Sequence, residues 1–269
     1  MKLEYYPIRR SQLLAEDYIR NFAAVKDFYE YDPSEEAGWR RRAEWLDADR
    51  LPRAGREQLA DRLSAYNRRI GNTPESLAAI NALRDGRTLT VVGGQQAGLF
   101  TGPLLVIYKA LTVIQTARKA ENLLGRRVVP VFWIAGEDHD FDEVNHIYWL
   151  NSDPSVQKLK IDHPTGLRSP VSAVPISESV WLEALGRLDE ALPDSEFKPE
   201  LLDMLKSTCL SSATLSDAFA RILVRLFGRY GLVLLDSADR EIRALEGPMF
   251  RRMIAEGTTL SEAYLSARH

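Results

Sequence analysis

Two polar segments of the chain combine the residue types that bind and transform small polar molecules. Residues 93–103 read GGQQAGLFTGP, and residues 136–146 read GEDHDFDEVNH. The first segment offers backbone N–H groups and neutral amides, which suit a phosphate, a carboxylate or a sugar hydroxyl. The second offers carboxylates and histidines, which suit acid–base catalysis, capture of an ammonium group or metal binding. Both segments are therefore candidate sites.

Each segment directly follows an apolar, β-branched run, at residues 89–92 and 128–134, and such runs predict buried parallel strands. Residues 104–124 lie between them and have the composition and length of a helix that crosses back over a sheet. A strand–helix–strand unit places both segments at the carboxyl ends of neighbouring strands, where open α/β sheets bind ligands. We therefore predict an α/β fold with its chemistry at that edge.

The first segment matches no standard phosphate-binding motif. It lacks the Gly-Lys-Ser/Thr of a P-loop and the spacing of a dinucleotide fingerprint. It is either an anion-binding loop or a tight turn whose glycines serve packing, and Lys109 in the following helix either reaches a phosphate or faces solvent. The candidate binding residues are Gly94, Gln95, Gln96, Gly98, Thr101, Gly102 and Lys109.

The second segment places charged residues directly after a strand that should be buried, so at least one charge should lie near the sheet edge. The catalytic candidates are Glu137, Asp138 and His139, and the candidates for substrate binding are Asp140, Asn145 and His146. The two histidines are seven residues apart, which is not a zinc-protease spacing, and we predict no metal site. The alternative is that Asp140 caps a helix while the other charges are solvated.

A third core strand is expected at residues 232–235, and it ends at Asp236 on the same edge. The carboxylate of Asp236 either holds a hydroxyl or amine of a ligand or caps the following helix, and the sequence does not decide between these roles.

The remaining pattern predicts helices and one small β insertion. Residues 1–87 carry apolar residues at helical spacing among many charges, which predicts a helical N-terminal region packed on a core of residues 88–269. The insertion is expected at about residues 150–177, with strands at 156–161 and 171–176. Helices should follow at residues 178–191, 199–210, 215–230 and 238–256.

The composition excludes several classes of protein. The chain has 269 residues and a formal net charge of -3, so no basic excess indicates a nucleic-acid partner. No apolar run has the length of a membrane span. Cys209 is the only cysteine, so there is no disulfide framework, which fits a cytoplasmic location. Within an amphipathic pattern, Cys209 is expected to be a buried small hydrophobe rather than a nucleophile.

The sequence also resembles a known family, the bacillithiol biosynthesis cysteine-adding enzymes (BshC), over nearly its whole length. The resemblance is carried by GQQAGLFTGP at 94–103 with Tyr108-Lys109, PVFWIAGEDHDFDEVNH at 130–146, LSDAFA at 215–220 and GLVLLD at 231–236. It implies a ligase that joins L-cysteine to glucosaminyl malate, built on a Rossmann-like core that resembles nucleotidyltransferases. Family members are longer and form homodimers through a C-terminal coiled coil, so this chain is expected to be an N-terminal portion.

The resemblance also implies roles for the candidate residues. Because forming an amide from a free carboxylate is uphill in water, activation by ATP is expected, with ATP or ADP as the nucleotide. A phosphate or carboxylate would then lie on residues 94–102. His139 would stabilise charge or move a proton, and Glu137 or Asp138 would orient an ammonium group. The alternatives are a non-catalytic module that binds a nucleotide or sugar acid, and a nucleotidyltransferase that acts on another substrate.

Overall fold

The computed structural model describes residues 12–48, 55–150 and 155–268, which fall into two compact units. The first unit contains residues 12–48 together with 122–125. It carries the helices α1 (Leu13–Arg20) and α2 (Glu36–Ala48). The rings of Tyr18 and Tyr29 pack within this unit at a centroid distance of 4.6 Å. The second unit contains the sheet and every candidate site residue, and the division predicted near residue 88 stays a prediction.

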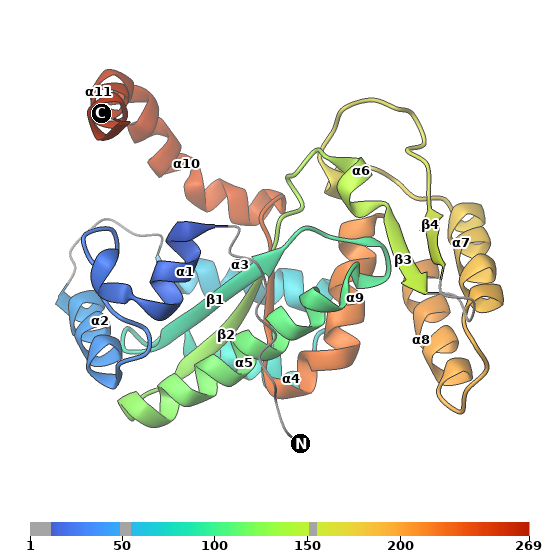
Figure 1. The fold of residues 1–269 in the computed structure, drawn as a ribbon, viewed down its shortest axis with the longest axis horizontal. Coiled ribbons are helices and arrows are strands. Elements are labelled where there is room, and N and C mark those ends of the chain that lie inside the picture. The colour runs from blue at the N-terminus through green and yellow to red at the C-terminus, as the bar shows by residue number, and fades with distance from the viewer. Residues whose placement is uncertain (1–11, 49–54, 151–154, 269) are drawn as a thin grey trace. The chain divides into compact units, whose positions relative to one another are not determined.

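The second unit is built on a parallel sheet with the strand order β1–β2–β5. Figure 1 labels its neighbouring strands β1 and β2. The strands are β1 (Leu89–Gln95), β2 (Val128–Ile134) and β5 (Val233–Asp236). The register pairs Gln95 with Ile134 and Ile134 with Asp236, so the three strands end at the same level. Both candidate segments and Asp236 therefore lie along one edge of the sheet, as the sequence predicted.

Helices cover both faces of the sheet at β2 and β5, which are buried almost throughout and read as continuous apolar runs, whereas Thr90 and Val92 of β1 are exposed. The helices are α3 (Arg56–Arg69), α4 (Pro74–Ala82), α5 (Leu104–Leu124) and α9 (Leu215–Phe227). Phe132 and Ile134 of β2 pack in one cluster with side chains of α5 and α9. Val129 and Val131, on the opposite face of β2, pack with side chains of α3 and α4. The α/β fold and the helix predicted at residues 104–124 are therefore confirmed, whereas the helix predicted at 215–230 ends at Phe227 and is followed by a 3-10 turn.

The outer edge of β5 is paired with a side chain of α3. The carboxamide of Asn67 donates to the carbonyl of Leu234 at 2.8 Å and accepts from its N–H at 3.1 Å. Asn67 is fully buried, and its amide thus bonds to the edge as a neighbouring strand would. This pairing holds α3 against the strand that carries Asp236.

The β insertion is a two-stranded hairpin. β3 (His146–Leu150) pairs antiparallel with β4 (Val156–Lys160), and residues 151–154 lie outside the described part of the chain. The strand predicted at 171–176 is wrong, because Val171–Ala173 forms a 3-10 turn. The N–H groups of Val171 and Ser172 donate instead to the carbonyls of Asp138 and Gly136, at 2.7 and 3.0 Å. The loop before this turn is thereby fastened to the second candidate segment.

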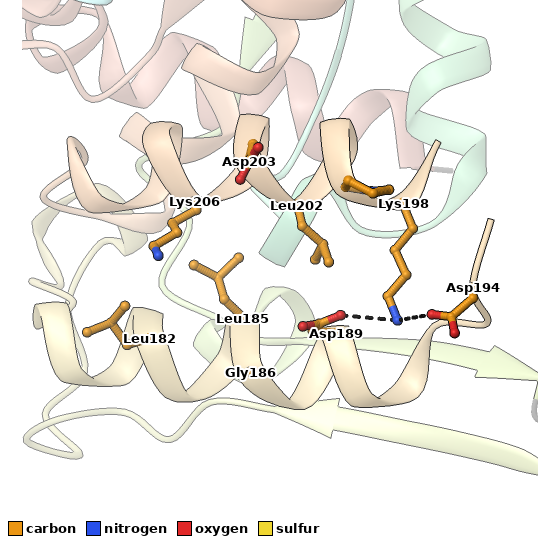
Figure 2. A pocket seen from close by; sticks show the side chains of 10 residues that line it. Leu182, Leu185, Gly186, Asp189, Asp194, Lys198, Leu202, Asp203 and Lys206 are labelled. Atoms are coloured by element: carbon orange, nitrogen blue, oxygen red, sulfur yellow. Dashed lines mark hydrogen bonds and ion pairs between the residues drawn. The ribbon is translucent and has the colours of Figure 1, made fainter. Parts of the chain in front are cut away.

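Beyond the hairpin, α7 (Glu178–Ala191) and α8 (Lys198–Leu210) form a helical pair. A cavity of about 540 Å³ lies between them, with Leu185 and Leu202 among its lining residues (Figure 2). The ammonium group of Lys198 lies between the carboxylates of Asp189 and Asp194, at 3.1 and 3.2 Å. The charges at this end of the cavity are therefore paired with one another.

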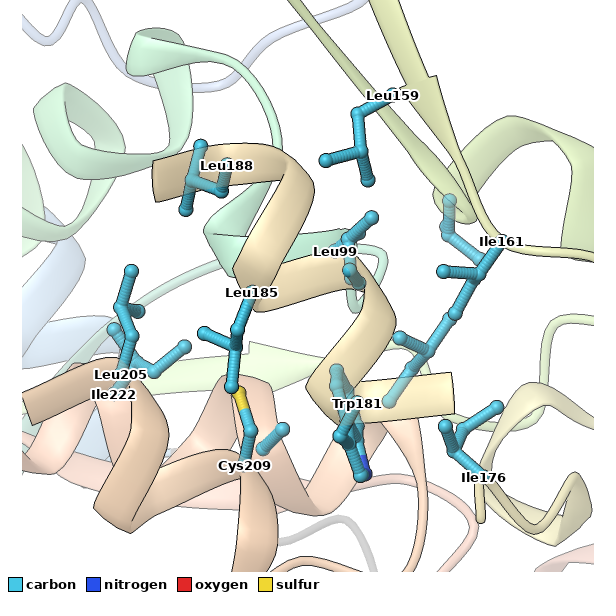
Figure 3. Packing of buried hydrophobic residues seen from close by; sticks show 14 of the residues in the cluster. Leu99, Leu159, Ile161, Ile176, Trp181, Leu185, Leu188, Leu205, Cys209 and Ile222 are labelled. Carbon is cyan, nitrogen blue, oxygen red and sulfur yellow. The ribbon is translucent and has the colours of Figure 1, made fainter. Parts of the chain in front are cut away.

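One apolar cluster joins the hairpin and the α7–α8 pair to the first candidate segment (Figure 3). Leu99 of that segment is fully buried in this cluster, with Trp181, Leu185 and Cys209. Burial also raises the pKa of the Cys209 thiol to about 12, so it stays protonated. Cys209 is thus a buried small hydrophobe, as predicted.

The described chain ends with the helices α10 (Arg240–Ala255) and α11 (Gly257–Arg268). Among the helices that the structure describes, none combines the length and the apolar character that a membrane crossing requires.

Candidate active site

The first segment begins as an extension of β1. Gly94 lies against β2 so closely that a Cβ atom would come within 2.4 Å of the carbonyl oxygen of Trp133. Glycine at this position therefore serves packing between strands, which is one of the two interpretations the sequence left open. The part of the segment that is free to contact a ligand lies further along, from Gln95 onward.

The turn that follows is held in an uncommon backbone conformation. Phe100 and Thr101 have positive φ angles of 48° and 78°, although neither is glycine, and Gly102 follows with a φ of 71°. Such residues cost about 1–3 kcal/mol each and cluster at functional sites, where packing over-determines them. Here Leu99 anchors the turn in the apolar cluster, and the ring of Phe100 lies 6.5 Å from that of Trp181. The turn is thus held in shape by packing, directly before α5 begins at Leu104.

A chain of side-chain hydrogen bonds connects the two candidate segments. Lys109 of α5 donates to Gln95 Oε1, and Gln95 donates to Gln96 Oε1 at 3.1 Å. Gln96 Nε2 then donates to a carboxylate oxygen of Asp138 at 2.8 Å and to one of Glu143 at 2.6 Å. The structure thus brings the amides of the first segment onto the carboxylates of the second, and Lys109 faces this cluster.

Within the second segment, Asp138 and His139 lie side by side. The backbone N–H of Asp140 and the amide of Gln96 hold the pKa of the Asp138 carboxyl below its ordinary value, so Asp138 is an anion at neutral pH. His139 is half exposed, and its Nδ1 lies 3.9 Å from Asp138 Oδ1. Its Nε2 contacts the guanidinium of Arg168. Arg168 was not among the predicted site residues, because a single arginine in a loop belongs to no sequence motif that indicates a binding site.

The other predicted residues of this segment are more dispersed. Glu137 is exposed, and Asp140 occupies the N-cap position of α6 (Phe141–Val144) without a side-chain capping bond. Asn145 is fully buried, and its amide donates to the carbonyl of Ile161 at 2.9 Å. His146 lies on β3, with Nδ1 at 3.1 Å from Asn145 Oδ1. Asn145 and His146 thus hold the hairpin in place, and their roles in ligand binding stay predictions.

Asp236 is a buried carboxylate at the end of β5. Only 7% of it is exposed, and burial raises its pKa to about 6, with the nearby charges of Asp239 and Glu137 adding to the effect. It touches the second segment, because a Cβ on Gly136 would lie 2.2 Å from Asp236 Oδ1. Its Oδ1 accepts from the N–H of Ala238 at 2.9 Å, which begins the next turn of the chain. Asp236 therefore forms one side of the edge at which both segments lie.

The strand-end cluster consists of Gln95, Gln96, Asp138, His139, Glu143, Arg168 and Asp236. None of the residues that line the α7–α8 cavity belongs to it. Within the described ranges, no three His, Cys, Asp or Glu side chains are grouped so that they could hold a metal ion. The cluster offers amides, carboxylates, an imidazole and a guanidinium, which suit a polar substrate with charged groups.

Comparison of the sequence with known proteins identifies the family of the chain. The sequence model of one family, described as bacillithiol biosynthesis BshC, N-terminal Rossmann-like domain, matches residues 1–269. The chain belongs to the BshC family. Its parallel sheet, with both candidate segments at the strand ends, is the Rossmann-like fold that this description names.

Curated relatives agree with this assignment. A protein of Geobacillus kaustophilus named "Putative cysteine ligase BshC" is 37% identical over 267 residues, which cover 99% of this chain and 48% of the relative. Proteins of the same name from Salinibacter ruber and Desulforamulus reducens are 39% and 34% identical, and the matches cover 43% and 48% of their lengths. The chain thus spans about half the length of these relatives.

Proposed function

We propose that this domain carries the active site of a cytoplasmic ligase that joins the carboxyl group of L-cysteine to the amine of glucosaminyl malate, forming bacillithiol. The observation that carries the proposal is the hydrogen-bond chain from Lys109 through Gln95 and Gln96 to Asp138, which organises both strand-end segments into one polar cluster. The family match over residues 1–269 supplies the reaction class.

The acidic part of the cluster suits the amine. Asp138 and Glu143 share a single amide donor, Gln96, and neither is paired with a lysine or arginine in the described part of the chain. Two carboxylates so close together favour a cation between them. An ammonium group of the substrate meets this need with hydrogen bonds as well as charge. These carboxylates therefore orient the amine for attack.

Asp236 suits the transfer of a proton. As the C–N bond forms and a C–O bond of the carboxyl group breaks, the amine must give up its protons. A general base works best when its pKa lies near the working pH, and the pKa of about 6 at Asp236 meets that condition. His139, half exposed beside Asp138, stabilises the charge that develops on the carboxyl oxygen.

The first segment fits a phosphate group. A Cβ on Gly98 would lie 2.9 Å from Gly102 Cα, so the turn is tight and presents backbone rather than side chains. The N-terminus of the 21-residue helix α5 follows directly and favours an anion. Gly98, Gly102 and Lys109 would hold the phosphates of ATP, and ATP would supply the free energy that activates the carboxylate. We propose further that full-length members dimerise through a coiled coil beyond this domain.

The test is product formation. A full-length protein that carries this domain would be incubated with cysteine, glucosaminyl malate and ATP, and the adduct detected by mass spectrometry. We expect product from the unchanged protein and, for Gln96→Ala, a loss of at least about tenfold, because an oriented hydrogen-bond donor contributes of this order. Thermal stabilisation by the ligands without product would instead indicate a non-catalytic binding module. Unchanged turnover in Gln96→Ala would reject the cluster as the active site.

A further inference from the structure

The loop at residues 162–170 delivers a cation to the candidate active site. The imidazole Nδ1 of His163 accepts the backbone N–H groups of Thr165 and Gly166, at 3.2 and 2.9 Å, which closes a turn within the loop. At the far end, Val171 donates to the carbonyl of Asp138 at 2.7 Å. Two anchors, one inside the loop and one on the second segment, thus hold the intervening residues over the strand ends.

Arg168 reaches the cluster from this loop. Its guanidinium contacts Nε2 of His139. The other ring nitrogen, Nδ1, lies 3.9 Å from Asp138 Oδ1. Asp138, His139 and Arg168 therefore follow one another as a carboxylate, an imidazole and a guanidinium.

Most of the donor capacity of Arg168 is unused. A guanidinium has five N–H donors, and the contact with His139 is the only interaction of Arg168 within the described residues. The side chain is exposed, and no carboxylate is paired with it there. Arg69 shows the contrast, since its guanidinium is bonded to Asp239 at 2.6 Å. Arg168 therefore keeps donors that are free to bind an anion from outside the chain.

We propose that Arg168 binds a carboxylate of the malyl group of glucosaminyl malate and thereby sets the specificity for that substrate. The assignment rests on the proposed function. A planar guanidinium matches a carboxylate with two parallel hydrogen bonds, which a lysine cannot reproduce. Malate carries two carboxylates that take no part in the bond being formed, whereas the carboxylate of cysteine is the reacting group. Arg168 therefore holds the acceptor while the acidic pair, Asp138 and Glu143, orients its amine.

The experiment measures the preference of a full-length protein carrying this domain for glucosaminyl malate over glucosamine that lacks the malyl group. Arg168→Gln should raise the KM for glucosaminyl malate about 10- to 100-fold while kcat stays within about threefold. The KM for glucosamine should stay unchanged, so the preference for the malyl compound collapses. Arg168→Lys should restore the preference only partly. Lys206→Gln, which removes a cation from the α7–α8 cavity, should behave as the unchanged protein does.

Three outcomes separate the claims. If Arg168→Gln keeps the preference for the malyl compound, the assignment of Arg168 is wrong and the proposed function stands. If the variant raises the KM for cysteine instead, Arg168 binds the cysteine carboxylate, which also overturns the malyl assignment. If the unchanged protein makes no product from either acceptor, the proposed function itself fails. A melting curve of Arg168→Gln that matches that of the unchanged protein excludes misfolding of the variant. We expect such a match, because Arg168 is an exposed loop residue.

Discussion

The strand-end cluster and the α7–α8 cavity are both polar, but their charges are arranged in opposite ways. In the cavity, Lys198 lies between Asp189 and Asp194, so its positive charge is already neutralised by the protein. At the strand ends, Asp236 is buried and has no ion-pair partner among the described residues. The more exposed Asp138 and Glu143 accept from the amide of Gln96 and have no lysine or arginine partner there. Unneutralised buried charge costs stability unless it is used. The size of a cavity is therefore a poorer guide to the site than the state of its charges.

The largest effect is expected from removing the buried charge. Asp236→Asn should lower turnover about 100-fold or more if Asp236 moves a proton. The same change should stabilise the fold, because the raised pKa means that the folded state keeps a proton which the unfolded chain has released. The contribution of the Asp236 carboxyl to the free energy of unfolding therefore falls as pH rises from about 4 to about 6, and it stays low above that range.

The stability of Asp236→Asn is measured by urea unfolding at two pH values. At pH 8 the variant should gain about 2–3 kcal/mol over the unchanged protein, and at pH 3.5 the two should coincide, since a shift of one pKa unit corresponds to about 1.4 kcal/mol. Asp189→Asn, on the cavity side, is the matched control and should leave both turnover and the pH profile unchanged. A pH profile that is the same for Asp236→Asn and the unchanged protein would refute the account of Asp236.

Smaller effects on stability, opposite in sign to each other, are expected when Gly136 and Gly186 are replaced by alanine. At Gly136 an added methyl group would lie 2.2 Å from Asp236 Oδ1, so Gly136→Ala should cost about 2 kcal/mol in urea unfolding through overpacking. At Gly186, in the middle of α7 and on the cavity, nothing lies within 4 Å of the added methyl. Gly186→Ala should therefore gain about 0.5–1 kcal/mol from helix propensity. Equal losses in both variants would show that the strand ends are no tighter than the cavity.

The smallest effect is expected from altering the link between the two segments. Gln96→Glu would replace the shared donor with a third carboxylate beside Asp138 and Glu143. In urea unfolding at pH 7 we expect the free energy of unfolding to fall by about 1–2 kcal/mol. The loss should shrink at pH 4, where carboxylates take up protons. Gln157→Glu on β4, whose amide bonds only to Ser155 among the described residues, is the control and should change little. A pH-independent loss in Gln96→Glu would mean that charge repulsion is not its cause.

Much of the fold was predictable because its signals are local. The buried strand at residues 128–134 and the helix at 104–124 were predicted with the bounds that the structure shows, since long apolar runs and helical spacing arise from neighbouring residues. The strand predicted at 171–176 failed because the carbonyls of Asp138 and Gly136, more than thirty residues away, take its N–H groups. The role of Asn67 as a substitute strand partner was invisible for the same reason.

The site was predictable in outline only. Spacing after predicted strands placed the two segments and Asp236 on one edge, because parallel strands share a direction. The Gln96–Asp138 bond and the approach of Arg168 to His139 depend on how distant loops pack, which no residue pattern encodes. Gly94 illustrates the limit, since its type suggested ligand contact and its surroundings show strand packing.

The most direct test of the strand-end cluster as the binding site is chemical-shift mapping of the 269-residue chain. Two-dimensional ¹⁵N–¹H spectra would be recorded while glucosaminyl malate, and then cysteine, is added. We expect saturable shifts at the backbone amides of Gln96, Asp138, His139 and Arg168, with residues 182–206 of the α7–α8 pair unaffected. Shifts confined to residues 182–206 would contradict the account, because the ligand would then bind at the α7–α8 cavity and not at the strand ends.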